Sequence, residues 1–172
     1  MIILLDAMGG DNAPDANIKG AVAAVNQVDA EIWLIGKEDV IKNKLKEFYN
    51  KRRKSFDDVV GDSSIRPNQL FAIGLHYPVV DSSSEEAKNA FETVTKKLLT
   101  PYGLKTLAKG EKCYREIYEG DQIKRDMSYH QGITWPWLLG IYSDSFLNII
   151  NAEKNKTKKK GKNRNGCDKI WF

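Results

Sequence analysis

The residues best suited to chemistry gather in one stretch, from Tyr118 to Gly140. It places aromatic rings among carboxylates, amides and a histidine: Tyr118, Asp121, Gln122, Arg125, Asp126, Tyr129, His130, Gln131, Trp135 and Trp137. The C–H face of a sugar stacks on an aromatic ring, and sugar hydroxyls bond to partners such as Asp, Arg and Gln. The combination predicts a carbohydrate-binding pocket. The alternative is an ordinary aromatic core with solvated polar residues, since aromatic clusters are usually buried.

A second set of polar residues stands at the start of an apolar helix that the sequence predicts after Ile65. These residues are Arg66, Asn68 and Gln69. In that position their side chains could be aimed at ligand hydroxyls. The alternative is plain helix capping by Asn68.

The elements that must position these residues are mostly helices. Ala87, Ala90, Phe91, Val94 and Leu98 recur at helical spacing and predict a helix over about 84–99. Another apolar helix is predicted over about 135–150, with Pro136 in its first turn. A long loop, residues 108–128, is expected between them, carrying the first part of the aromatic stretch.

The first 47 residues have a different pattern, that of a βαβ unit. Apolar runs at residues 1–6 and 31–36 predict two strands, the first one buried on both faces. A helix is expected between them to about Val28, and a further helix over 40–47. Gly9, Gly10, Asp11 and Asn12 form a glycine turn between the first strand and a helix start, which is a ready anion site. The alternative for this loop is a simple tight turn.

Several motifs in the second part of the chain resemble the C-terminal glucosidase region of glycogen debranching enzymes. They are Arg66-Pro67-Asn68-Gln69, Leu98-Leu99-Thr100-Pro101-Tyr102-Gly103, Arg125-Asp126, Tyr129-His130-Gln131-Gly132 and Trp135-Pro136-Trp137. The resemblance covers about residues 48–147. One departure is Ile133-Thr134, where the family is expected to have Thr then Val.

This resemblance implies an amylo-α-1,6-glucosidase fold, an α/α barrel of six helical hairpins, with an α-glucan or malto-oligosaccharide as ligand. Such glucosidases use two carboxylates, one acid and one base. The family's Trp-Met-Asp and Ser-Glu-Ile-Phe segments, which carry them, are not found in these residues. We therefore assign no catalytic residue and expect Asp121 and Asp126 to contact or support substrate.

The opening of the chain resembles bacterial phosphate acyltransferase. Asp6-Ala7-Met8-Gly9-Gly10-Asp11, Ala13-Pro14 and Gly20-Ala21 carry this likeness, which fades near Glu47. It implies an alternative function, a phosphate-binding α/β module of phospholipid synthesis. We interpret the whole as a composite: a βαβ fragment over 1–47, a mainly helical debranching-type fragment over 48–152, and a basic tail over 153–172.

Charge and cysteine content narrow the partners. The net charge is +4, but residues 153–169 alone carry +6, so the rest of the chain is slightly acidic. The basic tail has no apolar period and predicts disorder, and nucleic acid is not an expected partner. No apolar run approaches the roughly 18 residues of a membrane span. Cys113 and Cys167 lack CxxC spacing, so we expect reduced thiols, no metal site, no cofactor and a cytoplasmic protein.

Overall fold

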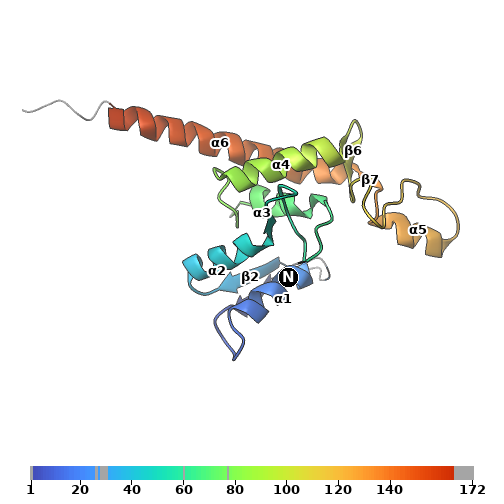
Figure 1. The fold of residues 1–172 in the computed structure, drawn as a ribbon, viewed down its shortest axis with the longest axis horizontal. Coiled ribbons are helices and arrows are strands. Elements are labelled where there is room, and N and C mark those ends of the chain that lie inside the picture. The colour runs from blue at the N-terminus through green and yellow to red at the C-terminus, as the bar shows by residue number, and fades with distance from the viewer. Residues whose placement is uncertain (1, 26, 28–30, 60, 77, 165–172) are drawn as a thin grey trace, which may run out of the picture.

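The computed structural model describes residues 2–25, 27, 31–59, 61–76 and 78–164. The chain is a mixed helical and β structure with small sheets (Figure 1). The long helix α6, Leu139–Arg164, lies beside α4, Glu85–Leu98. The N-terminal strands and helices lie on the other side of α3, Phe71–Gly74. The helix α5, Gln122–Tyr129, forms a lobe at one end.

The N-terminal part is the βαβ unit that the sequence predicts. Its elements are β1 (Ile2–Asp6), α1 (Asp15–Val25), β2 (Glu31–Ile35) and α2 (Glu38–Leu45). The two strands pair in parallel, with Leu4 opposite Trp33. The intervening helix makes this parallel pairing possible, because parallel strands need a crossover connection.

The prediction that the first strand is buried on both faces is wrong. Leu4 is 61% exposed, and its partner Trp33 is 52% exposed. Among the described residues this sheet has two strands, whereas a strand buried on both faces needs covering elements above and below it. The apolar run therefore indicates the strand correctly but not the environment of its side chains.

Short elements lead from this unit to the helices. They are η1 (Lys46–Phe48), β3 (Tyr49–Asn50), β4 (Ser55–Phe56), η2 (Pro67–Leu70) and α3. The strands β3 and β4 form an antiparallel pair. Arg66 is the extended residue before η2, and Pro67 stands in the first turn of η2, where a missing N–H costs nothing.

The helix α4 forms where the apolar spacing predicts it. Ser84 caps its start by accepting a hydrogen bond from the Ala87 amide at 3.1 Å, and two glutamates follow in the first turn. Ala87, Ala90, Val94 and Leu98 are buried. They form one face because residues three and four apart lie on the same side of a helix.

The region after α4 contains more regular structure than the sequence predicts. A three-stranded antiparallel sheet joins β5 (Leu99–Thr100), β6 (Gly103–Lys105) and β7 (Thr134–Trp135). The expected loop over 108–128 contains most of α5, which begins at Gln122. The helix expected from residue 135 begins instead after a turn of 3-10 helix, η3 (Pro136–Leu138), because Trp135 is extended and pairs with Leu104.

Two apolar clusters hold these elements together. The first contains Ile65, Leu70, Val94, Leu98, Leu104, Ala108 and Leu138, with Trp135 and Tyr142 packed against it. The second contains Phe48, Phe56, Ile73, Ala87, Ala90 and Ile149. Val22 and Leu45 of the βαβ unit pack against this second cluster. The N-terminal unit is thereby joined to the helices through apolar contacts.

The basic tail is helical for longer than its composition predicts. Disorder was expected from residue 153, whereas α6 continues through Arg164. Lysine is a good helix former, and the packed first half of α6 supplies the nucleus that an isolated helix lacks. An ion pair of 2.6 Å between Lys88 and Glu153 also holds this part of the helix to α4. Residues 165–172, for which disorder was also expected, lie outside the described residues.

Within the described ranges, no helix is both long enough and apolar enough to cross a membrane.

Candidate functional site

The centre of the candidate site is the guanidinium group of Arg66. Its Nη1 donates to the carbonyl oxygens of His130 at 2.7 Å and Thr106 at 3.3 Å. Its Nη2 donates to Oε1 of Gln131 at 3.0 Å. Arg66 thus joins the segment before η2 to the Tyr-His-Gln-Gly segment, 64 residues further along the chain.

Hydrogen bonds to Thr106 also hold the backbone at the end of the Tyr-His-Gln-Gly segment. The amide of Gly132 donates to the hydroxyl of Thr106 at 2.9 Å, and the Thr106 amide donates to the Ile133 carbonyl at 3.0 Å. Gly132 has a φ of 135°, and a Cβ there would lie 2.5 Å from the Arg115 carbonyl oxygen. Only glycine fits this position, because both its conformation and its surroundings exclude a side chain.

An aromatic cluster lies next to this segment. The Tyr129 ring packs against Trp135 with centroids 4.8 Å apart, against His130 at 4.8 Å and against Tyr118 at 6.1 Å. The indole N–H of Trp135 donates to the Tyr129 carbonyl at 3.2 Å, which fixes the two rings together. Tyr118 is 44% exposed and Tyr129 39% exposed, so the cluster is open to solvent. We call Tyr118, Tyr129, His130 and Trp135 the aromatic cluster.

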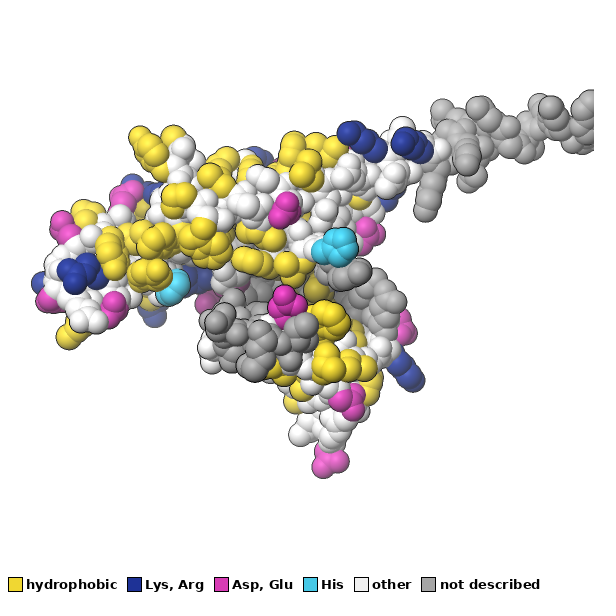
Figure 2. All heavy atoms as spheres, turned by 180° about the vertical axis from the view of Figure 1, so that it is seen from behind, with side chains coloured by type: hydrophobic (Ala, Val, Ile, Leu, Met, Phe, Trp, Pro, Cys, Tyr) yellow, Lys and Arg dark blue, Asp and Glu magenta, His cyan; other side chains and the backbone are white. Residues whose placement is uncertain are grey.

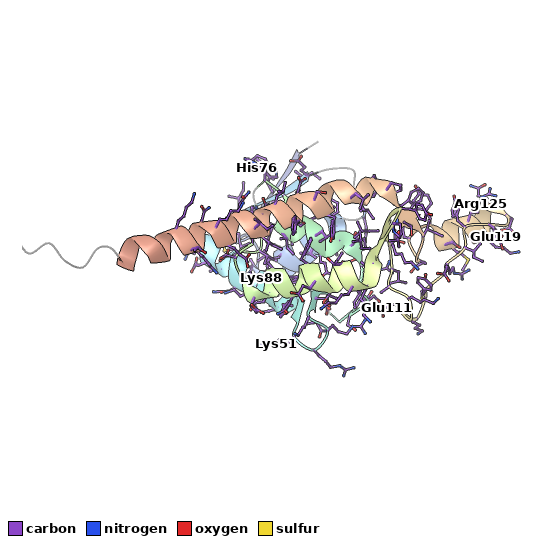
Figure 3. The ribbon with its side chains drawn as sticks, turned by 90° about the horizontal axis from the view of Figure 1, so that it is seen from above. Lys51, His76, Lys88, Glu111, Glu119 and Arg125 are labelled. Carbon is purple, nitrogen blue, oxygen red and sulfur yellow. The ribbon has the colours of Figure 1, made fainter. Side chains whose placement is uncertain are left out.

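The surroundings of the cluster are visible in the figures. Figure 2 shows hydrophobic side chains gathered on the surface between the lobe that carries α5 and the body of the molecule. In Figure 3, Glu119 and Arg125 lie in that lobe, far from Lys88 and Lys51. Trp137 is 65% exposed, the most exposed tryptophan among the described residues. Neither predicted tryptophan is enclosed in the core, although Trp135 packs against the first apolar cluster.

Two residues predicted to contact sugar point elsewhere. Gln69 is buried; its Oε1 accepts from the Phe56 amide at 3.1 Å, and its Nε2 donates to the Arg66 carbonyl at 2.9 Å. Asn68 donates to Oδ2 of Asp58 at 2.7 Å. Neither acts as a helix cap, since no side-chain bond caps η2. Their side chains brace the segment that carries Arg66.

The polar residues of α5 have mainly local partners. Asp121 caps the helix by accepting from the Lys124 amide at 2.9 Å, and Arg125 donates to the Gly120 carbonyl at 2.6 Å. Gln122 and Asp126 are exposed on the same helix. The structure therefore places these four residues in the α5 lobe, where two of them stabilise the start of the helix.

Sequence reasoning missed Asp58, a half-buried carboxyl beside the site. Burial raises the pKa of Asp58, while the hydrogen bond from Asn68 and the charge of Arg66 act in the opposite direction. Asp58 follows Asp57 in a short acidic segment, and nothing in the pattern distinguishes one from the other. Only the pairing with Asn68 identifies it.

A lysine beside the Tyr-His-Gln-Gly segment was also missed. The Lys105 ammonium donates to the Tyr114 hydroxyl at 2.6 Å and to Glu116 at 3.2 Å. The hydrogen bond to Tyr114 raises the pKa of Lys105. The Tyr114 ring in turn lies where a side chain at Gly132 would point. Lys105, Tyr114 and Glu116 therefore pack next to Gly132 of the Tyr-His-Gln-Gly segment.

The glycine loop near the N-terminus is held by hydrogen bonds to the side chains of Asp6 and Asn17. The Met8 amide donates to Asp6 Oδ1 at 2.8 Å, and the Asn17 side chain donates to the carbonyls of Asp6 and Gly9, both at 2.8 Å. A Cβ at Gly9 would lie 2.8 Å from the Asp6 carboxylate. This carboxylate occupies the space beside the loop and disfavours an anion near Gly9, Gly10, Asp11 and Asn12.

No cluster of three or more His, Cys, Asp or Glu side chains suited to a metal ion occurs in the part of the chain that the structure describes. Cys113 is exposed with a free thiol.

These features define a mixed helical and β protein whose helical part carries an exposed aromatic cluster braced by an arginine. The profile of the amylo-alpha-1,6-glucosidase family matches residues 15–168. The chain therefore belongs to that family, and the resemblance of its second part to glycogen debranching enzymes is confirmed. The match begins at residue 15, within the βαβ unit.

The resemblance of the opening residues is confirmed as well. The chain is similar to the phosphate acyltransferase of Thermotoga maritima, with 54% identity over 44 residues, or 26% of this chain and 14% of that protein. The enzyme of Acetivibrio thermocellus is 55% identical over 53 residues, 30% of this chain and 14% of that protein. That of Heliobacterium modesticaldum is 39% identical over 75 residues, 44% of this chain and 22% of that protein. The chain spans less than a quarter of each of these relatives.

Proposed function

We propose that this chain is a glucan-binding part of a glycogen debranching protein, and that α-glucan lies on the aromatic cluster. The observation that carries the proposal is the exposure of Tyr118 and Tyr129 next to the polar side chains of His130 and Gln131. A sugar needs an aromatic surface for its C–H face and nearby donors and acceptors for its hydroxyls. Membership of the amylo-alpha-1,6-glucosidase family supports glucan as the sugar.

The finer architecture belongs to the same proposal. The antiparallel packing of α4 and α6 is compatible with a fragment of an α/α barrel, with residues 48–152 as the debranching-type part and 1–47 as a separate unit. Family membership supports a glycoside hydrolase region, for which a cytoplasmic location is part of the proposal. Residues 153–172 would form a basic extension.

Binding without hydrolysis is the activity that we propose for this chain alone. An inverting glycosidase needs two carboxyl groups about 6.5–9.5 Å apart across the substrate. Asp121 is committed to capping α5, and Asp126 is exposed on the same helix. Asp58 is bonded to Asn68. None of these carboxyl groups forms an acid–base pair facing the aromatic cluster.

The proposal is tested by titrating the protein with maltohexaose in a calorimeter. We expect binding with about millimolar affinity. Tyr118→Ala should weaken it by roughly 3- to 10-fold through lost stacking. Tyr102→Ala is the matched control, because Tyr102 is 79% exposed on the turn between β5 and β6, outside the aromatic cluster. Unaltered affinity in Tyr118→Ala, or equal losses in both variants, would remove the aromatic cluster as the binding surface.

The alternative function is phosphate binding at the N-terminal glycine loop. It is supported by the identity to phosphate acyltransferases over this region. It is opposed by the Asp6 carboxylate at Gly9 and by Asp15 in the first turn of α1. Phosphate titration followed by NMR distinguishes the cases, since a phosphate site requires the Gly9 and Gly10 amide signals to move.

A further inference from the structure

The contact between Arg66 and Gln131 determines the orientation of the Gln131 side-chain amide. A guanidinium group has five N–H donors and no acceptor. A side-chain amide has an oxygen that accepts and an NH2 group that donates. Since Arg66 can only donate, the oxygen of Gln131 must face it, and the distance of 3.0 Å to Oε1 agrees.

The other end of the Gln131 amide is then directed away from Arg66. Among the residues that the structure describes, none accepts a hydrogen bond from Nε2 of Gln131. The side chain is half-buried, so its NH2 group is restricted but reachable. Gln131 directly follows His130, whose ring packs on Tyr129. Since the same guanidinium group contacts the His130 carbonyl oxygen and Oε1 of Gln131, the free donor group lies near the backbone of His130, a member of the aromatic cluster.

The backbone around Gln131 is as constrained as its side chain. Its amide donates to the Ser128 carbonyl at 2.9 Å, and its carbonyl accepts from the Arg115 amide. Gly132 follows in a conformation closed to side chains. With the backbone fixed on both sides, the Arg66 contact determines which way the amide group faces.

Most of the donors of Arg66 are directed at the protein. Three of its five N–H donors are engaged: Nη1 donates to two carbonyl oxygens and Nη2 donates once, to Gln131. The sequence-based prediction treats Arg66 as a sugar contact. Its three protein partners instead give it the role of organising a segment distant in sequence.

We propose that Arg66 is a positioning residue that locks the Gln131 amide with its oxygen inward, so that Gln131 donates a hydrogen bond to an oxygen atom of the glucan on the aromatic cluster. The ligand part of this inference rests on the proposed function. The locking of the amide does not. The consequence for specificity is that this position recognises an acceptor oxygen, such as a ring, bridging or hydroxyl oxygen.

The decisive variant is Gln131→Glu. A carboxylate has nearly the same shape and pairs with Arg66 through a charge-assisted bond, but it has no NH2 group to donate. We expect a melting temperature equal to or above that of the parent, together with affinity for maltohexaose lowered by about tenfold or more. Gln27→Glu, which adds the same charge in the N-terminal unit, should bind as the parent does. Parent-like affinity in Gln131→Glu would overturn the proposal.

A second measurement separates the two parts of the inference. The side-chain NH2 signals of Gln131 are compared by NMR in the parent and in Arg66→Lys, without ligand. Lysine lacks the planar fork of arginine, so we expect both signals to shift and to exchange faster with solvent. Unchanged signals in a folded Arg66→Lys variant would overturn the locking role. If the signals differ between the parent and Arg66→Lys but the parent binds no maltohexaose, the locking role is supported. The donor role and the proposed function are then both refuted.

Discussion

The side-chain amide of Asn68 donates to Oδ2 of Asp58 over 2.7 Å. Asn68 belongs to the Arg-Pro-Asn-Gln segment, and Asp58 lies ten residues earlier, before the turn at Gly61. The bond therefore closes the loop from Asp58 to Asn68, and Asn68 lies two residues after Arg66. Burial raises the pKa of Asp58, and the nearby Asp62 and Asp57 act in the same direction.

This raised pKa predicts a specific pH dependence. The folded protein holds the Asp58 proton more tightly than the unfolded chain does, so ionisation of Asp58 costs stability as pH rises from about 4 through the raised pKa. Asp58→Asn removes that cost, while its amide oxygen still accepts from Asn68. We expect the variant to melt at a higher temperature than the parent at pH 7, and the difference to vanish below about pH 4.

The comparison must be made as a difference between variant and parent, because other carboxyls titrate in the same range. Asp62 accepts bonds from Ser64 that lower its pKa, so its contribution has the opposite sign and is lost as pH falls. Asp62 is unchanged in both proteins. A lower melting temperature for Asp58→Asn at pH 7 would contradict the account of Asp58.

The first apolar cluster should dominate stability. Leu98, the last residue of α4, is fully buried in this cluster, and Leu98→Ala should lower the free energy of unfolding by about 2–5 kcal/mol. Its neighbour Leu99 is 39% exposed, and Leu99→Ala should cost less, about 1 kcal/mol or below. Urea denaturation followed by circular dichroism measures both. Equal losses would mean that the boundary between buried and exposed residues at the end of α4 is misplaced.

Two glycines predict opposite effects of the same substitution. Gly103 has a φ of 148°, and a Cβ there would lie 2.5 Å from the Trp135 carbonyl oxygen. Gly103→Ala should destabilise the protein by more than about 1 kcal/mol, because strand β7 must move. Gly140 in α6 has open space at the Cβ position. Gly140→Ala should stabilise by roughly 0.5–1 kcal/mol.

The glycine pair is measured by thermal melting of the two variants beside the parent. Gly103 is the first residue of β6 and pairs with Thr100 of β5. A stabilised Gly103→Ala would show that β6 and β7 do not approach as closely as described.

Hydrolysis provides a negative prediction. Because Asp58, Asp121 and Asp126 form no acid–base pair at the aromatic cluster, we expect the purified chain to release no measurable glucose from α-1,6-branched limit dextrin, since each such proton transfer contributes about 10²- to 10⁴-fold in rate. A coupled glucose assay measures this. Steady turnover that disappears in Asp126→Asn but persists in Glu119→Gln would place a catalytic carboxyl on α5 and contradict the prediction.

The sequence predicts an element correctly where the spacing of apolar residues within that element is enough to define it. The spacing of Ala87, Ala90, Val94 and Leu98 predicts α4 almost residue by residue, and the two apolar runs predict the parallel strands. The strand β7 could not be predicted, because two residues, Thr134–Trp135, carry no period. Their extended form depends on pairing with β6, a contact between distant segments.

The site shows the same limit. The aromatic composition of the Tyr-His-Gln-Gly region indicates a cluster, and the structure brings Tyr118, Tyr129 and Trp135 together. Sequence reasoning placed Gln69 with them, but a side chain that bonds to backbone groups on both sides is directed into the core. Whether a polar residue faces a ligand or the protein depends on partners that the linear pattern does not reveal.

The most direct test of the glucan-binding account is an NMR titration of the tryptophan indole N–H signals with maltohexaose. The Trp135 indole N–H donates to the Tyr129 carbonyl within the aromatic cluster, whereas Trp33 lies in strand β2 of the N-terminal unit. The account predicts a saturable shift of the Trp135 signal with an affinity of about millimolar, and no shift of the Trp33 signal. A Trp135 signal that stays in place up to saturating sugar, or equal shifts of both signals, would contradict it.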